Sequence, residues 1–256
     1  FPVELVKDET PVELHILLQL RWIDFGKSNT TVHQEGKVYS GFFARRGQIE
    51  FEGSLNQENI RWGIMIDPIA LSNKITQDIY ISLEYIPFLY LKFGQFKYPQ
   101  NLDSRTSSAK LHFASRSMIG RFFGDKRDLG IKLGHNFEKF EYGFGWFNGS
   151  GRNTPENNNK KDFTARLLIK PIKSVSFGGS IYRGRQPTGV TERTAAEIKF
   201  NYKNLVLQSE YQVGQDSNLE RWGLYLQAGY LLGKHIQPGL RGEIWEPNKN
   251  NLKDKM

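Results

Sequence analysis

Apolar and polar residues alternate with a period of two along most of this chain. Between residues 76 and 86, for example, Ile79, Ile81 and Leu83 alternate with polar neighbours. A spacing of two places each set on its own face of a β-strand. No stretch has a comparably sustained helical period, so the chain is predicted to be all-β. The side chains expected on the apolar, outward face include Ile79, Ile81, Leu83, Phe163, Leu167, Ile198 and Phe200.

The alternating pattern divides the chain into thirteen segments, most of them nine or more residues long. A strand that crosses a bilayer at a tilt needs about 9–11 residues, whereas strands of globular proteins average about 5–6 residues. The lengths therefore predict a transmembrane antiparallel β-barrel rather than a soluble β-sandwich. The segments are residues 12–26, 38–55, 60–71, 76–86, 88–99, 128–137, 140–148, 162–170, 174–184, 194–202, 205–214, 220–232 and 236–246.

The connections between these segments alternate in length, which also favours a bacterial barrel. Such barrels have short periplasmic turns at one end and longer external loops at the other. The expected periplasmic turns are residues 56–59, Pro87, 138–139, 171–173, 203–204 and 233–235. The expected external loops are residues 27–37, 72–75, 100–127, 149–161, 185–193 and 215–219, of which the second is short.

Aromatic residues gather near the ends of the segments on the apolar track, as expected for the girdles at the two membrane interfaces. Ordinary enrichment of aromatic residues in strands is the alternative, and the repetition at segment ends argues against it. The aromatic residues concerned are Tyr85, Phe88, Phe137, Phe140, Phe144, Trp146, Tyr202, Tyr211, Trp222 and Tyr230.

The polar track is too charged to form a packed apolar core. Unpaired charges are very costly to bury, so these side chains must face water or pair across a lumen. A solvated barrel interior accounts for all of them. The charged or ionisable residues on this track are His15, Arg21, Arg46, Glu50, Glu52, Arg61, Asp78, Glu84, Lys92, Lys132, Arg166, Lys199, Glu210, Arg241 and Glu243.

Composition narrows the function classes. The 256 residues include 35 Lys and Arg against 27 Asp and Glu, a formal charge of +8, and no cysteine. A basic chain attracts anions, nucleic acid or anionic lipid, but no basic helix or aromatic RNA-binding signature is present, so we predict no nucleic-acid partner. The sequence also has no enzyme motif and no metal-ligand spacing, so we predict that the protein is not an enzyme and holds no cofactor. A hydrolase whose catalytic groups come from separate strands remains the enzymatic alternative.

A series of short motifs follows one another along the chain: residues 43–53 (FARRGQIEFEG), 91–99 (LKFGQFKYP), 106–108 (TSS), 116–117 (RS), 127–130 (RDLG), 147–151 (FNGSG), 165–166 (AR) and Pro171. In this order they resemble the phosphate-selective porin O and P family, and the resemblance spans about residues 40–245. It implies a bacterial outer-membrane channel of sixteen strands, often trimeric, for passive diffusion of phosphate or other small anions.

The chain departs from this family pattern in strand number. Thirteen strands are visible, and antiparallel bacterial barrels close with an even number. An open sheet edge leaves backbone groups unsatisfied in lipid. We therefore expect residues 1–256 to form one barrel domain that lacks about three C-terminal strands of the complete protein.

Residues 100–127 form the longest connection and are the leading functional segment. Long loops in compact domains are usually functional or disordered. Its apolar residues predict packing against the inner wall, where the loop would narrow the pore and line it with charge. A solvated loop that binds lipopolysaccharide phosphates is the alternative. Six bases, Arg105, Lys110, Arg116, Arg121, Lys126 and Arg127, outnumber two acids, Asp103 and Asp125.

Pore-lining or anion-binding roles are predicted for Arg105, Lys110, Arg116 and Arg121 of this loop, and for Lys92, Arg46 and Arg166 on strands. Arg46 shares the track of Gln48 and Glu50, which places Arg45 near an interface or a bulge. Ion pairs with neighbouring acids are the competing interpretation for Arg46 and Arg166. The expected partners are membrane lipid, lipopolysaccharide and small anions, with a homotrimer or a larger envelope complex possible. A scaffold role in such a complex is the alternative to a conducting porin.

Overall fold

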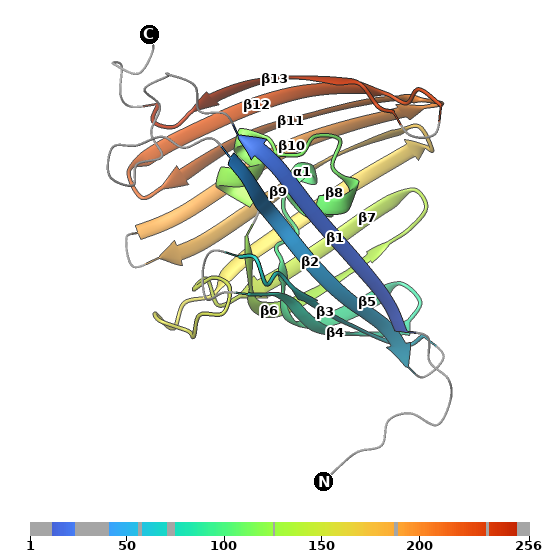
Figure 1. Ribbon diagram of the computed structural model, residues 1–256. Coiled ribbons are helices and arrows are strands. Elements are labelled where there is room, and N and C mark those ends of the chain that lie inside the picture. The colour runs from blue at the N-terminus through green and yellow to red at the C-terminus, as the bar shows by residue number, and fades with distance from the viewer. Residues whose placement is uncertain are drawn as a thin grey trace.

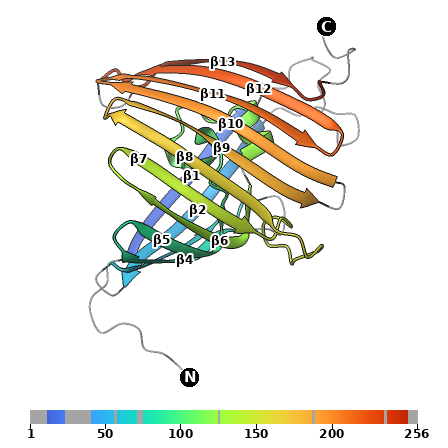
Figure 2. The same cartoon turned by 180° about the vertical axis from the view of Figure 1, so that it is seen from behind.

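The structure is a computed structural model of the chain. It describes residues 12–23, 41–55, 58–70, 75–124, 126–186, 189–233 and 236–249. Figures 1 and 2 show long, tilted strands that lie side by side and curve around an interior. Among the described residues, no helix has the length and apolar character that a membrane crossing requires.

Thirteen strands form one sheet in sequence order, and every neighbouring pair is antiparallel. The predicted all-β barrel architecture and the predicted strand number are confirmed. The strands are β1 (Val12–Ile23), β2 (Gly41–Leu55), β3 (Ile60–Ile66), β4 (Thr76–Ile86), β5 (Leu89–Lys97), β6 (Arg127–Asn136), β7 (Phe140–Phe147), β8 (Asp162–Ile172), β9 (Val175–Gln186), β10 (Gly189–Tyr202), β11 (Leu205–Asp216), β12 (Leu219–Tyr230) and β13 (Gly239–Glu246).

The convex face of the sheet carries the apolar track. Ile79, Ile81, Leu167 and Ile198 are 42–51% exposed, as expected for side chains that face lipid. The remaining three residues of the predicted outward set, Leu83, Phe163 and Phe200, lie on the same track and are half-buried by neighbours.

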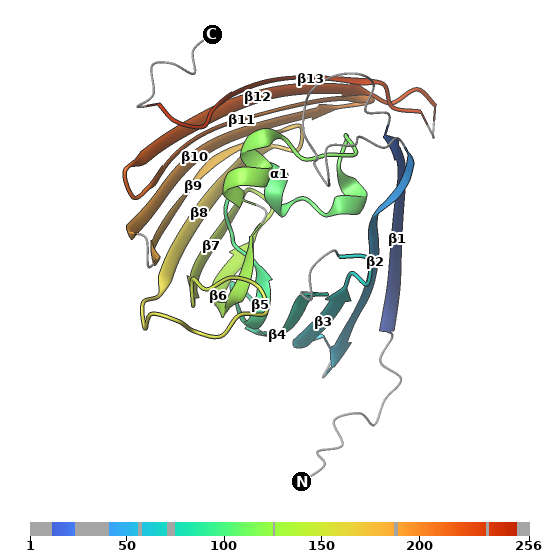
Figure 3. The same cartoon turned by 60° about the vertical axis from the view of Figure 1, so that its left-hand side comes forward.

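β1 and β13 form the two edges of the sheet and curve around the interior from opposite sides (Figure 3). Neither has a second strand partner among the described residues. Strand direction alternates along the sheet, so the first and the thirteenth strands, β1 and β13, run in the same direction.

Two of the predicted external loops are wrong. β9 extends to Gln186 and β10 begins at Gly189, both inside the predicted loop 185–193, and β11 and β12 leave only residues 217–218 of the predicted loop 215–219 between them. The strands extend further than the sequence pattern predicted, so this part of the sheet has tight hairpins at both ends. Outside the lipid, outward side chains need not be apolar, and the alternation that predicts a strand fades although backbone pairing continues.

The connection between β5 and β6 lies on the concave side of the sheet (Figure 3). We call residues 98–124 the inner segment. It contains three short helices: α1 (Leu102–Arg105), the 3₁₀-helix η1 (Ser108–Lys110) and the π-helix η2 (Gly120–Gly124). The segment occupies part of the space that the sheet encloses.

Candidate functional site

A buried carboxylate on β11 holds the start of α1. The side chain of Glu210 accepts hydrogen bonds from the backbone N–H groups of Leu102 (2.7 Å) and Asp103 (3.0 Å). Tyr225 of β12 donates its hydroxyl to the same carboxylate at 2.8 Å. Glu210 is 1% exposed, so these three donors replace the hydrogen bonds that water would otherwise make to its side chain.

Further contacts attach the inner segment to other strands. Asn101 donates to the Gln212 side chain at 2.7 Å, and Arg193 of β10 donates to the Phe123 carbonyl at 2.7 Å. The Ser115 hydroxyl accepts a hydrogen bond from Arg45 of β2 (2.6 Å), and the Ser115 carbonyl accepts one from Arg241 of β13 (2.8 Å). The segment is therefore tied both to β2, near one edge of the sheet, and to β10, β11 and β13, towards the other edge.

Apolar packing supports the same attachment. Ile119 and Phe123 are each 1% exposed and pack against Tyr225, with Trp245 of β13 beside them. Phe122 stacks on the Trp245 ring with centroids 4.7 Å apart. The aromatic residues of the segment thus have apolar partners on the concave face.

Arg116 supports the fold of the segment itself. It is 1% exposed and donates to the backbone carbonyls of Asp103 and Thr106. The Asp103 carboxylate accepts hydrogen bonds from the N–H and hydroxyl of Ser117, both at 2.8 Å. Arg116 was predicted to line the pore, yet its guanidinium is directed at backbone oxygens inside the segment.

Arg105 and Arg166 share the carboxylate of Glu141 on β7, at 3.0 and 2.9 Å. Arg166 also pairs with Glu197 of β10. Arg166 and Glu197 are almost fully buried, so this pair lies between the wall and the inner segment. For Arg166, the geometry favours the ion-pair interpretation over contact with passing ions.

The predicted strand residues Lys92 and Arg46 occupy different settings. Lys92 lies over the Tyr80 ring, with its ammonium 3.5 Å from the ring centroid. Arg46 donates to the side chain of Gln19 at 2.7 Å. The register between β1 and β2 shifts beside Gln19, which makes Arg45 the extra residue of a β-bulge. The bulge explains how two adjacent arginines both reach inward partners.

Lys110 and Arg121 are exposed on the inner segment. Arg121 contacts Met118 within the same turn of chain. These two residues keep the solvent access that an anion-attracting role requires, whereas Arg116 is buried and Arg105 is half-buried in its ion pair with Glu141.

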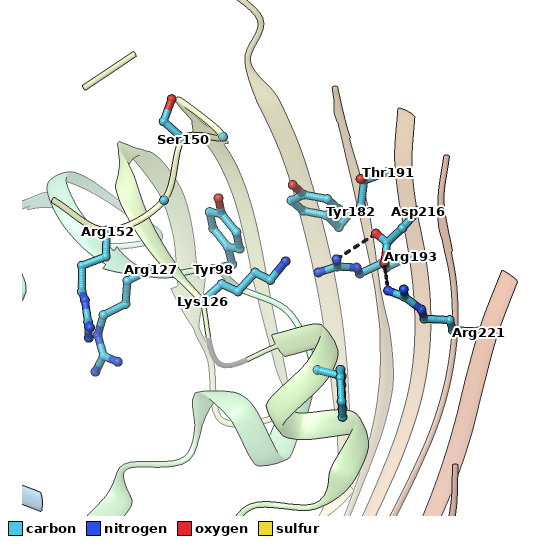
Figure 4. A pocket seen from close by; sticks show the side chains of 13 residues that line it. Tyr98, Lys126, Arg127, Ser150, Arg152, Tyr182, Thr191, Arg193, Asp216 and Arg221 are labelled. Atoms are coloured by element: carbon cyan, nitrogen blue, oxygen red, sulfur yellow. Dashed lines mark hydrogen bonds and ion pairs between the residues drawn. The ribbon is translucent and has the colours of Figure 1, made fainter. Parts of the chain in front are cut away.

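A cavity of about 710 Å³ lies between one end of β6 and the ends of β10–β12 (Figure 4). We call it the basic cavity. Its single carboxylate among the described residues, Asp216, accepts from both Arg193 (3.1 Å) and Arg221. Tyr98 and Tyr182 also line it. The cationic side chains that line it are Lys126, Arg127, Arg152, Arg193 and Arg221.

The ammonium group of Lys126 has a pKa that is lowered from the ordinary value for lysine. Desolvation inside the cavity and the positive charge of Arg193 lower its pKa to about 8, although part of the side chain remains exposed to solvent. Its charge therefore depends on pH where the arginine charges do not.

The family model for phosphate-selective porin O and P matches residues 17–189 of this chain. The chain belongs to this porin family. The match begins within β1, at Leu17, and includes β2–β9 and the whole inner segment. Its family and fold make the protein an anion channel of the bacterial outer membrane.

Solved structures that are similar to this porin have little sequence in common with it. An anion-selective porin from Comamonas acidovorans has 11% identity and a TM-score of 0.50, and the match covers 94% of this chain and 90% of that one. A loop L8 deletion mutant of OmpT from Vibrio cholerae has 9% identity and a TM-score of 0.48, with 93% and 94% covered. No curated protein sequence matches the chain.

Sequence reasoning did not select the porin's basic cavity. Arg152, Arg193 and Arg221 come from three different parts of the chain and converge only in the folded sheet. Arg193 extends the inward track of β10 beyond the predicted start of that strand. A longer prediction for β10 would have placed it on the polar face.

Proposed function

We propose that this porin passes small anions, phosphate among them, by passive diffusion, and that the inner segment narrows its lumen. The observation that carries the proposal is the basic cavity, where five cationic side chains and one carboxylate line a single space. The structurally similar porin from Comamonas acidovorans is anion-selective, which agrees with this proposal.

Electrostatics explains how such a cavity selects. Asp216 offsets one of its two arginine partners, and Asp78 offsets Arg127 from outside the cavity lining, so the remaining cations leave the cavity positive. Charges in a narrow space act on a passing ion at short range, whereas charges on a wide wall are screened over about 8 Å at physiological salt. An anion then exchanges part of its hydration for arginine and lysine donors and moves on, because no single group holds it. Transport of this kind needs no catalytic residue.

Lys126 offers a test through its pKa. In planar bilayers with a salt gradient, we expect an anion-selective reversal potential that moves towards zero as pH rises from about 7 to about 9, because Lys126 loses its proton near pH 8. Lys126→Gln is expected to show weaker anion selectivity at pH 7 and no such step. Lys126→Arg is the matched control and should keep full selectivity at both pH values.

A cation-selective wild type would contradict the proposed function. Equal pH dependence in all three proteins would show that the titration of Lys126 does not set the selectivity of the channel. Purified protein that inserts but conducts no current would favour the scaffold alternative.

We also propose that further strands close the sheet between β13 and β1. The two edge strands run in the same direction, and a free edge in lipid would leave a row of backbone groups unsatisfied. An even number of strands restores antiparallel pairing throughout. Intact mass spectrometry of the native protein is expected to give a mass well above 29.6 kDa. A native protein of that mass with a closed, stable barrel would contradict this proposal.

The partners follow from the same reasoning. The exposed apolar residues on the convex face suit lipid chains, and lipopolysaccharide is the partner that we propose for the external rim. A homotrimer agrees with the family resemblance and is part of the proposal.

A further inference from the structure

A second cavity, of about 350 Å³, separates the inner segment from the β1–β4 wall. We call it the polarised cavity. On the wall side it is lined by the carboxylates of Glu50 and Glu52 on β2 and Asp78 on β4. Glu50 and Glu52 are two positions apart on one strand, so their side chains share the inward face.

Cationic residues line the opposite side of the polarised cavity. Arg105 on α1 and Lys110 on η1 belong to the inner segment, and Lys97 at the end of β5 adjoins it. Arg127 at the start of β6 lines both this cavity and the basic cavity. Acids on one wall thus face bases on the other across a space of molecular size.

Most of these charges have partners within the protein. Arg127 makes a two-point ion pair with Asp78, at 2.9 and 3.0 Å, and Arg105 pairs with Glu141. Lys97 donates to the Ser104 carbonyl at 2.7 Å. Glu52 accepts the Tyr80 hydroxyl at 2.8 Å.

Two opposite charges are left for a ligand. In the part of the chain that the structure describes, Glu50 and Lys110 have no hydrogen-bond or ion-pair partner for their charged groups. Glu50 is half-buried on the wall, and Lys110 is exposed on the inner segment. A purely anionic solute gains from Lys110 and is repelled by Glu50, whereas a solute with both charges gains from each.

We propose that the polarised cavity accepts small zwitterionic solutes, with the solute cation at Glu50 and the solute anion at Lys110. The proposal rests on the proposed function in one respect, that the lumen conducts solutes. The polarised cavity would add a class of solutes that carry no net charge. A cavity that only attracts anions does not promote the passage of such solutes.

Liposome swelling tests this with two isomers, zwitterionic β-alanine and uncharged lactamide. Equal size makes the ratio of their rates a measure of charge recognition. We expect Glu50→Gln and Lys110→Gln each to lower the β-alanine to lactamide ratio by about threefold, the effect of one solvent-accessible ion pair. Glu220→Gln is the matched control, because Glu220 lies on the outward track of β12 and pairs with Lys249. It should leave the ratio unchanged.

An unchanged ratio in both Glu50→Gln and Lys110→Gln would overturn the proposal. If Glu50→Gln does not fold, Lys110→Gln decides, since Lys110 is exposed on the inner segment. Failure of the proposed function is a separate result, because reversal potential measures anion preference and neither isomer carries net charge.

Discussion

Arg166→Met is expected to lower the free energy of unfolding of this porin by about 3–5 kcal/mol, the cost of removing one partner from a buried ion pair. Arg166 pairs with Glu197 and Glu141, and removing the guanidinium leaves the Glu197 carboxylate buried without its cation. Desolvation of an uncompensated charge, more than the lost attraction, accounts for the size of the effect. Denaturant titration of the refolded protein in lipid vesicles measures it.

Arg183→Met provides the matched control. Arg183 also pairs with a glutamate, Glu192 at 3.0 Å, but its side chain is 76% exposed on the outward face. Exposed ion pairs contribute about 0–1 kcal/mol. The double variant Arg166→Met with Glu197→Gln should recover part of the stability, because no buried charge is then left alone. Equal losses in Arg166→Met and Arg183→Met would show that Arg166 is not in a desolvated pair.

Glu210→Ala is expected to release the inner segment from β11 and so to raise both the single-channel conductance and the current noise. The substitution removes the acceptor of the Leu102 and Asp103 N–H groups and of the Tyr225 hydroxyl. Each buried donor left without a partner costs about 1–3 kcal/mol, which is enough to favour a solvated position for the segment. Trypsin should then cleave after Arg105 and Lys110 faster than in the wild type.

The β-barrel should survive this change, because the strands keep their backbone pairing. Glu220→Ala, on the outward face of β12, is the control and should leave conductance, noise and cleavage unchanged. A quiet channel of wild-type conductance in Glu210→Ala would mean that the remaining contacts of Arg193, Arg45 and Arg241 hold the segment without Glu210.

Strand number and facing could be predicted because lipid imposes a strict rule on one face. Every second side chain between the two interfaces must be apolar, and Ile79, Ile81 and Ile198 follow from that rule. Beyond the interface the rule lapses. Around Arg185 and Gln215 the outward residues are polar, and the extended hairpins there could not be distinguished from loops.

Individual roles within the inner segment depend on contacts that spacing does not encode. Arg116 and Lys110 are close in sequence and alike in charge, yet Arg116 is buried against backbone carbonyls while Lys110 is exposed. The basic cavity has the same origin, since Lys126 and Arg221 are brought together only by the order of strands in the sheet.

The attachment of the inner segment also sets an order of events during assembly. Leu102 bonds to a residue 108 positions later, and Ser115 bonds to Arg241, 126 positions later. Hairpins between sequential strands close short loops and form early, whereas contacts so distant in sequence must wait for the intervening chain. The segment therefore reaches its final place only after β11 and β13 have joined the sheet, and the narrowing of the lumen is a late step in the maturation of the protein.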